Sequence, residues 1–203
     1  MLFHNYLEML FGSKVKIKVL RTLWRYREKE FTIRELAKFL GISHTGINKV
    51  LDELEKTNAI RVRTFGRSYA FKLNVNSYAA SVVEKVFDME RRALSELLEM
   101  LKRRLDSPLV TSAALFGSIV KERETPRSDI DIFIVTDQKE KVEEIVVELQ
   151  KDVSERFGNS ISAYYASEKD LRKKQKGPPI KQALQDHMLI CGKPLGGNNV
   201  SQS

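Results

Sequence analysis

Residues 31–74 read FTIRELAKFLGISHTGINKVLDELEKTNAIRVRTFGRSYAFKLN, and this stretch decides the fold of the first part of the chain. Thr32 is followed three residues later by Glu35, which is the capping-box spacing that begins a helix. Gly41 can adopt the left-handed conformation that ends that helix. A second helix follows, and its inward face consists of Ile47, Val50, Leu51 and Leu54. The stretch therefore predicts two amphipathic helices joined by a glycine turn.

Further elements are predicted on either side of this helix pair. A helix capped by Ser13 and running to about Tyr26 precedes it, and two short strands at 60–64 and 69–73 follow it. Two helices joined by a glycine turn and followed by a hairpin resemble the winged helix-turn-helix domains of prokaryotic transcription regulators. The resemblance implies that the second helix of the pair enters the major groove of double-stranded DNA, and that the hairpin, or wing, touches the backbone or the minor groove.

The residues on the outward face of that helix suit contacts with DNA. Its first turns present short polar or basic side chains that can reach base edges and phosphates, namely Ser43, His44, Thr45, Asn48 and Lys49. The wing adds Arg61, Arg63 and Arg67 as expected phosphate contacts. The basic excess lies in the same region, because residues 1–75 hold 15 Lys/Arg and 7 Asp/Glu while the rest of the chain holds 20 of each. Two alternatives stay open: the basic residues merely solvate a surface, or the domain docks another protein.

Residues 76–106 predict one long helix, which ends at Ser107-Pro108 because a residue before proline avoids helical geometry. Apolar side chains recur at three- and four-residue steps along this helix, interrupted by Glu90; they are Ala80, Val83, Phe87, Leu94, Leu97 and Leu101. This stripe pairs with its copy in a homodimer or packs against the chain's own domains, and both alternatives stay open. We expect a homodimer, because winged-helix regulators usually read two half-sites.

A second informative stretch, AALFGSIVKERETPRSDIDIFIV, occupies residues 113–135. Gly117 and Ser118 end an apolar strand, and Asp129 and Asp131 open the next one after ten intervening residues. Side chains alternate along a strand, so the two aspartates project from the same face. Two carboxylates this close suit Mg²⁺, while Gly117 allows a phosphate to approach and Ser118 can donate hydrogen bonds to it. The alternative is an ordinary turn with two strand-edge aspartates, which is costly on an otherwise apolar strand.

Gly-Ser, ten residues and then Asp-x-Asp between two strands resemble the DNA polymerase beta-like nucleotidyltransferase superfamily, particularly its minimal members, over residues 108–195. The resemblance implies that Asp129 and Asp131 are catalytic and hold Mg²⁺, and that Gly117 and Ser118 bind a nucleoside triphosphate. The chain departs from the family pattern in two ways. Glu122 stands where minimal members usually have a glycine, and the candidate strand at 159–165 lacks the third acid that acts as general base in active members. Without that base, nucleotidyl transfer would be slowed or lost.

The combined prediction is an α+β chain of four parts. A winged helix-turn-helix domain occupies 1–75, a linking or dimerisation helix occupies 76–106, a nucleotidyltransferase-like mixed sheet with flanking helices occupies 107–195, and a disordered tail occupies 196–203. Because Cys191 is the only cysteine, a disulfide framework and a zinc knuckle are excluded.

The function expected from this organisation is that of a cytoplasmic DNA-binding transcriptional regulator that binds Mg²⁺ and a nucleoside triphosphate. No run of eighteen apolar residues occurs, so no membrane span is expected. The alternative is an active nucleotidyltransferase that modifies a protein, a nucleic acid or a small molecule, including as the antitoxin of a toxin–antitoxin pair. The missing third acid favours the regulator, and the DNA-binding domain disfavours the antitoxin.

Overall fold

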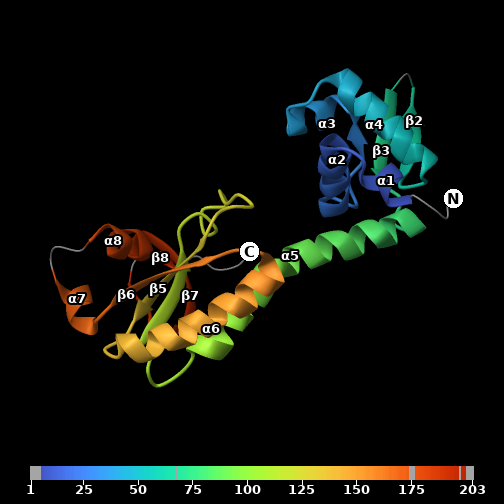
Figure 1. The fold of residues 1–203 in the computed structure, drawn as a ribbon. Coiled ribbons are helices and arrows are strands. Elements are labelled where there is room, and N and C mark those ends of the chain that lie inside the picture. Colours follow the sequence, from blue (N-terminus) through green and yellow to red (C-terminus); the bar gives the residue numbers. More distant parts are fainter. Residues whose placement is uncertain (1–5, 67, 174–176, 197, 200–203) are drawn as a thin grey trace. The chain divides into compact units, whose positions relative to one another are not determined.

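The computed structural model describes residues 6–66, 68–173, 177–196 and 198–199. The chain divides into two units, Met1–Arg92 and Ala93–Ser203, and each has its own hydrophobic core. The N-terminal unit contains, in chain order, α1 (Tyr6–Phe11), α2 (Lys14–Arg25), β1 (Phe31–Thr32), α3 (Ile33–Leu40), α4 (His44–Lys56), β2 (Ile60–Phe65), β3 (Ser68–Leu73) and the first part of α5 (Tyr78–Leu105) (Figure 1).

The helix boundaries predicted from capping residues in this unit are confirmed. The Ser13 hydroxyl accepts a hydrogen bond from the Lys16 amide at 3.2 Å, which begins α2. The Thr32 hydroxyl accepts from the Glu35 amide, and the Glu35 carboxylate accepts in return from the Thr32 amide at 2.8 Å. Gly41 ends α3 with φ of 64°, the left-handed geometry that glycine adopts without strain.

The predicted hairpin is confirmed as β2 and β3, which form a three-stranded antiparallel sheet with β1 in the order β1-β3-β2. Ile60, Phe71 and Leu73 point from one face of this sheet into the first core, where they meet the buried faces of α2, α3 and α4. The short elements α1 and β1 were not predicted, because six and two residues are too few to show a clear hydrophobic period.

The long helix α5 is confirmed, and its apolar stripe packs within the chain. Ala80, Val83 and Phe87 belong to the core of the N-terminal unit, whereas Leu97 and Leu101 belong to the core of the C-terminal unit. Leu94 is half-buried against the second core. Intramolecular packing is therefore the correct alternative for this stripe, and the stripe does not form a dimer seam.

The C-terminal unit contains the end of α5 and then a mixed α/β arrangement (Figure 1). Its further elements are β4 (Ser112–Phe116), β5 (Ile130–Val135), α6 (Lys139–Phe157), β6 (Ile161–Ala166), α7 (Glu168–Arg172), α8 (Pro178–Gln185), β7 (Asp186–Gly192) and β8 (Asn198–Asn199). The strand order is β6-β5-β4-β7-β8, and β5 and β6 run parallel while β4 is antiparallel to both of its neighbours.

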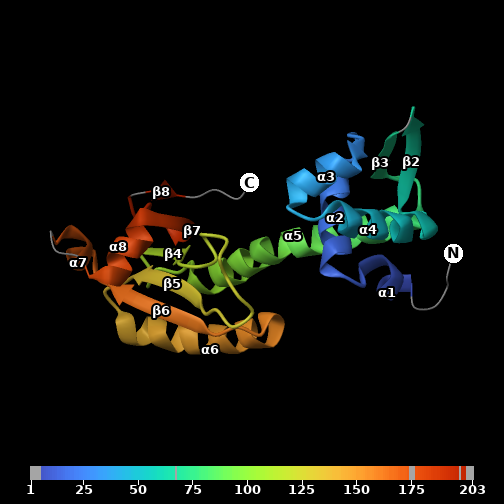
Figure 2. The same ribbon diagram turned by 90° about the horizontal axis from the view of Figure 1, so that it is seen from above.

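Helices cover both faces of this sheet. Ile130, Ile132 and Ile134 of β5 point toward the side of α5 and α6, into the second core. Phe133 and Val135 of the same strand point the other way, into a smaller cluster with the buried Ala183 of α8. Figure 2 shows α6 and α8 on opposite sides of the sheet. The face that carries Phe133 therefore also carries Asp131, since alternate residues of a strand share a face.

Two features of the C-terminal unit differ from the sequence-based expectation. Helix α7 was missed, although Ser167 and Asp170 form a capping box that the sequence displays. Within the predicted disordered tail, Asn198–Asn199 instead form β8, whose backbone pairs with the open edge of β7. Residues 197 and 200–203 of that tail lie outside the described residues. In the described parts of the chain, no helix is both long and apolar enough to span a membrane.

Candidate functional sites

Three neighbouring strands bring a row of side chains together on the α8 side of the sheet. Asp131 of β5 lies opposite Phe116 of β4 on one side and opposite Ser162 of β6 on the other. Residues that are directly opposite across a strand pair share a face, so these three side chains point the same way. Phe116 is buried, whereas Asp131 and Ser162 are half-buried and border the open part of this face.

Gly117 follows this row directly and makes room for the Asp131 carboxylate. Its φ of 80° lies in the left-handed region, and a Cβ added there would come within 2.1 Å of Oδ2 of Asp131. Any other residue would therefore both strain the backbone and displace that carboxylate. Ser118 is half-buried and continues the turn, with its carbonyl accepting a hydrogen bond from the Arg123 amide at 2.9 Å.

The loop between β4 and β5 is held in place at its C-terminal end, where Asp129 lies. Asn159 donates a side-chain hydrogen bond to the carbonyl of Ser128 at 3.0 Å, and the Ile130 amide donates to the carbonyl of Ser160 at 2.8 Å. These two bonds tie the residues on either side of Asp129 to the segment that leads into β6. The sequence analysis did not identify Asn159, whose only visible signal is its position after the glycine that ends α6.

The two aspartates create an unfavourable electrostatic environment that a cation would relieve. Partial burial raises the pKa of Asp131, and the negative charge of Asp129 raises it further. Magnesium in phosphate-binding sites usually has one or two protein carboxylates, with phosphate oxygens and waters completing its shell. The described residues contain no cluster of three or more His, Cys, Asp or Glu that could hold a metal alone. The oxygen ligands that the two aspartates offer are of the kind that magnesium prefers.

The pairing of β6 with β5 shows which residue of β6 lies beside Asp131. Ser162 lies directly opposite Asp131, and Ser160 precedes the strand. The predicted lack of an acid on this strand holds, because β6 reads ISAYYA. Glu168 and Asp170 lie beyond its end in α7.

A groove of about 500 Å³ in the N-terminal unit collects several of the predicted DNA-contacting residues. It is lined by Thr32, Ile33, Arg34, His44, Thr45, Asn48, Ser68 and Tyr69. His44, Thr45 and Asn48 of α4 are thus brought together, and Lys49 is exposed on the same helix. Ser43 is used differently, because its hydroxyl caps α4 by accepting a hydrogen bond from the Gly46 amide at 3.2 Å.

The wing residues Arg61 and Arg63 are exposed and also bond within the chain. Arg61 and Arg63 project from the sheet face opposite to the one that Val62 and Phe71 direct into the core. Arg61 donates a hydrogen bond to Asn74 at 2.9 Å, and Arg63 forms an ion pair with Glu30 at 3.8 Å.

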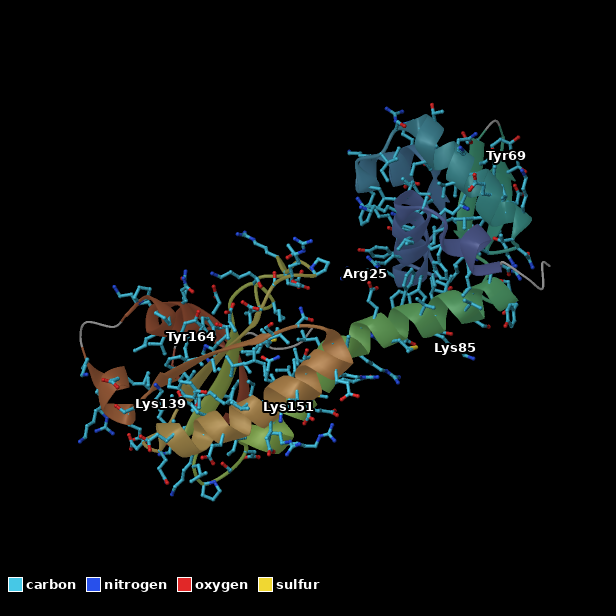
Figure 3. All side chains as sticks on the ribbon, viewed as in Figure 1. Arg25, Tyr69, Lys85, Lys139, Lys151 and Tyr164 are labelled. Atoms are coloured by element: carbon cyan, nitrogen blue, oxygen red, sulfur yellow. The ribbon has the colours of Figure 1, made fainter. Side chains whose placement is uncertain are left out.

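Two other wing residues line the groove, and the sequence analysis missed both. They are Ser68 and the exposed Tyr69, which is labelled in Figure 3. Ser68 and Tyr69 are consecutive and point to opposite faces of β3, so strand alternation alone does not identify the residues that line the groove. Arg67 lies outside the described residues.

Comparison with known families identifies the second unit. Residues 94–191 match the family model described as the nucleotidyltransferase domain. These residues form a nucleotidyltransferase domain. The match contains the whole Gly-Ser and Asp-x-Asp segment, together with β4, β5, β6 and the described part of the chain as far as Cys191 of β7. No curated protein sequence matches the chain.

Several solved structures are similar to the N-terminal region of the chain. Reduced HlyU from Vibrio cholerae is 15% identical over 41% of this chain and 84% of its own, with a TM-score of 0.36. NolR from Sinorhizobium fredii is 15% identical over 41% of this chain and 79% of its own, also with a TM-score of 0.36. A homodimeric winged helix-turn-helix DNA-binding domain from Mycobacterium bovis is 15% identical over 44% of this chain and 79% of its own, with a TM-score of 0.38. The winged-helix architecture of this unit is visible in its own elements, α3, α4 and the β2–β3 hairpin.

Proposed function

We propose that the chain is a DNA-binding transcriptional regulator whose nucleotidyltransferase domain binds a nucleoside triphosphate together with Mg²⁺. The observation that carries the nucleotide half of this proposal is the close approach of Gly117 to the Asp131 carboxylate. A side chain is excluded at the point where a strand ends in a Gly-Ser turn, and a half-buried carboxylate occupies the space beside it. This is the arrangement that a phosphate and its magnesium ion require.

Each residue of the site has a distinct role in this proposal. Asp129 and Asp131 hold the magnesium ion, while Gly117 and Ser118 leave room for the triphosphate and donate to its oxygens. When bound, the ion neutralises the two carboxylates and polarises the phosphate groups. Asn159 holds the loop on the N-terminal side of Asp129, so it positions that carboxylate without touching the ligand.

The test is calorimetric titration of the full chain with ATP in the presence and absence of Mg²⁺. We expect Mg²⁺-dependent binding in the wild type, and a loss of that binding in Asp131→Asn. Asp137→Asn is the matched control, because Asp137 is an exposed aspartate shortly after the same strand. Equal ATP affinities for Asp131→Asn and the wild type would exclude the acid pair from nucleotide binding.

The second candidate function is active nucleotidyl transfer to a protein, a nucleic acid or a small molecule, and the family match favours it. The residue beside Asp131 limits this candidate, because Ser162 cannot act as a carboxylate base. We expect no multiple-turnover attachment of labelled triphosphate by the wild type, and a measurable gain in Ser162→Asp. Rapid transfer by the wild type would instead establish the enzyme.

The DNA half of the proposal depends on the groove between α4 and the wing. His44, Thr45 and Asn48 read base edges, while Lys49 and the wing contact phosphates. Logarithmic affinity for operator DNA then falls linearly with logarithmic salt, and Lys49→Ala reduces the slope by about 1. Asn48→Ala relaxes the sequence preference, whereas Lys151→Ala, an exposed lysine on α6, changes neither. Unchanged preference and slope in the first two variants would exclude α4 from the interface.

A homodimer in this proposal uses a second face of α5, distinct from the buried stripe. Tyr78, Val86 and Met89 are exposed, and the half-buried Val82 continues the same line at helical spacing. A second copy of the chain would cover these side chains and place two recognition helices on two half-sites.

A further inference from the structure

Tyr164 lies on the same face of the sheet as Asp131, two residues after Ser162 on β6. The residue is 36% exposed on β6, which is an edge strand of the five-stranded sheet. Its ring meets the buried ring of Phe116 edge-on, with 5.5 Å between the centroids and 70° between the planes. Phe116 is also the β4 neighbour of Asp131, so one aromatic side chain contacts the open ring and flanks the carboxylate.

The next residue, Tyr165, is a useful comparison because its side chain has only a packing role. It points to the other face, where it packs against the second core. Burial raises its pKa to about 12, and the Lys139 ammonium lies 5.5 Å from the centre of its ring. Figure 3 labels Tyr164 and Lys139. Among these two tyrosines, only Tyr164 leaves part of its ring uncovered on the side of the site.

The spacing of the strands places this ring at a useful distance from the metal-binding carboxylates. Adjacent strands are about 4.8 Å apart and two residues span about 6.6 Å, so the backbone of Tyr164 lies roughly 8 Å from that of Asp131. A nucleotide whose phosphates sit at Asp131 and Gly117 reaches this far with its sugar and base. An exposed aromatic ring held by a second ring offers a rigid surface on which a base can stack.

We propose that Tyr164, held from below by Phe116, is the platform on which the nucleobase of the bound triphosphate stacks. This inference rests on the proposed nucleotide-binding function and specifies its ligand as a base-bearing triphosphate rather than a polyphosphate. Stacking on a single ring face tolerates every base, so affinity follows the stacking area of the base, with ATP bound more tightly than UTP.

The experiment compares the Mg²⁺-dependent binding of ATP with that of inorganic tripolyphosphate, which carries the phosphates without a base. In the wild type, ATP should bind more tightly than tripolyphosphate. Tyr164→Leu should weaken ATP binding about tenfold or more and leave tripolyphosphate binding unchanged. Tyr164→Phe keeps the ring and should retain ATP affinity, and Tyr165→Phe serves as a control on the opposite face.

Each outcome separates this inference from the function on which it rests. Wild-type protein that binds neither ligand with Mg²⁺ would overturn both the proposed function and the platform. Equal affinities of the wild type for ATP and tripolyphosphate would be consistent with the proposed phosphate site. They would exclude base stacking on Tyr164. An equal loss of both ligands in Tyr164→Leu would also exclude it, because the tyrosine would then support the sheet and not the base.

Discussion

Glu122 has φ of 51°, a left-handed conformation that an L-residue with a side chain adopts only at a cost. Minimal nucleotidyltransferases usually have a glycine at this position. In this chain a glutamate adopts the left-handed backbone conformation that favours glycine. The Glu122 amide donates to the carbonyl of Ile119 at 3.0 Å, which closes the turn and holds that geometry. The loop that follows the Gly117–Ser118 turn therefore has a strained backbone at Glu122.

Replacing Glu122 with glycine should stabilise the C-terminal unit by up to about 1 kcal/mol, because the relieved strain exceeds the added freedom of the unfolded chain. Differential scanning calorimetry of the full chain measures the change. Glu122→Ala is the matched control, since it removes the carboxylate but keeps the Cβ. If Glu122→Ala stabilises as much as Glu122→Gly, the charge and not the backbone is responsible.

Gly117 combines a left-handed backbone with close contact to Asp131, and the two effects can be separated. Gly158 has a similar φ of 75° with no atom within 4 Å of an added Cβ, so Gly158→Ala measures backbone strain alone. Gly117→Ala should destabilise the C-terminal unit by more than Gly158→Ala and should abolish Mg²⁺-dependent ATP binding, which Gly158→Ala retains. Calorimetry of unfolding and of binding measures both effects, and equal losses in the two variants would contradict the steric role of Gly117.

At the scale of elements, the capping box of α3 links stability to pH. The backbone amide of Thr32, and then its hydroxyl, hold the pKa of Glu35 below its ordinary value by donating hydrogen bonds to the carboxylate. A carboxyl whose pKa is lowered on folding stabilises the fold above its unfolded pKa, and this contribution is lost as pH falls through the folded value.

Thr32→Ala should therefore destabilise the N-terminal unit by about 1 kcal/mol at neutral pH, with a smaller effect in acid. Glu35→Gln should flatten the pH dependence of unfolding below the ordinary glutamate pKa. Thermal unfolding at neutral pH and at about pH 3 measures both variants. A Thr32→Ala penalty that stays constant over this range would show that the carboxylate does not take part in the cap.

The elements that could be predicted are those with a local physical cause. Ser13, Thr32 and Gly41 end or begin helices through bonds to residues three or four positions away, so the sequence displays them directly. The same reasoning would have found α7 from Ser167 and Asp170. The two-residue strand β1 has no local signal, because its pairing partners lie in β3, almost forty residues further along the chain.

The residues of the candidate site could be predicted from the sequence, but the pairing of β5 with β6 could not. Strand alternation predicts a shared face for Asp129 and Asp131, although β5 begins at Ile130, one residue after Asp129. Strand alternation does not predict the partner of Asp131 on β6, because Ile161–Ala166 contains apolar and small residues on both faces. Long-range bonds fix that register, including the one from the Ile161 amide to the Gln150 side chain of α6 at 2.5 Å. Phosphate contacts by Arg61 and Arg63 stay a prediction, and their bonds to Asn74 and Glu30 could not be read from the sequence because they join residues far apart in the chain.

At the scale of the whole molecule, α5 contributes buried residues to both cores. Other apolar residues of the same helix are exposed to solvent. The buried stripe stabilises the fold, whereas the exposed Tyr78, Val86 and Met89 belong to the face that the proposed homodimer would cover. We therefore expect that substitutions on this face perturb the proposed homodimer without perturbing the fold.

Val86→Glu together with Met89→Glu should convert the proposed homodimer to a monomer and weaken operator binding, without lowering the melting temperature of the monomer. Sedimentation and DNA titration measure the two effects. Val147→Glu, at an exposed valine of α6, is the control and should leave the dimer intact. A dimer that survives both charges on α5 would place the subunit interface elsewhere.

Cys191 gives the molecule a practical property. It is the only cysteine of the chain and is 6% exposed on β7, and burial raises the pKa of its thiol to about 11. At neutral pH the folded chain therefore presents a protonated, shielded thiol that reacts slowly with alkylating reagents. Cysteines introduced at exposed positions, such as Lys38 in α3 and Lys151 in α6, would take up fluorescent dyes selectively over this native thiol. Energy transfer between the two dyes would then measure, in solution and without removal of Cys191, whether adding nucleotide changes the distance between the N-terminal and C-terminal units.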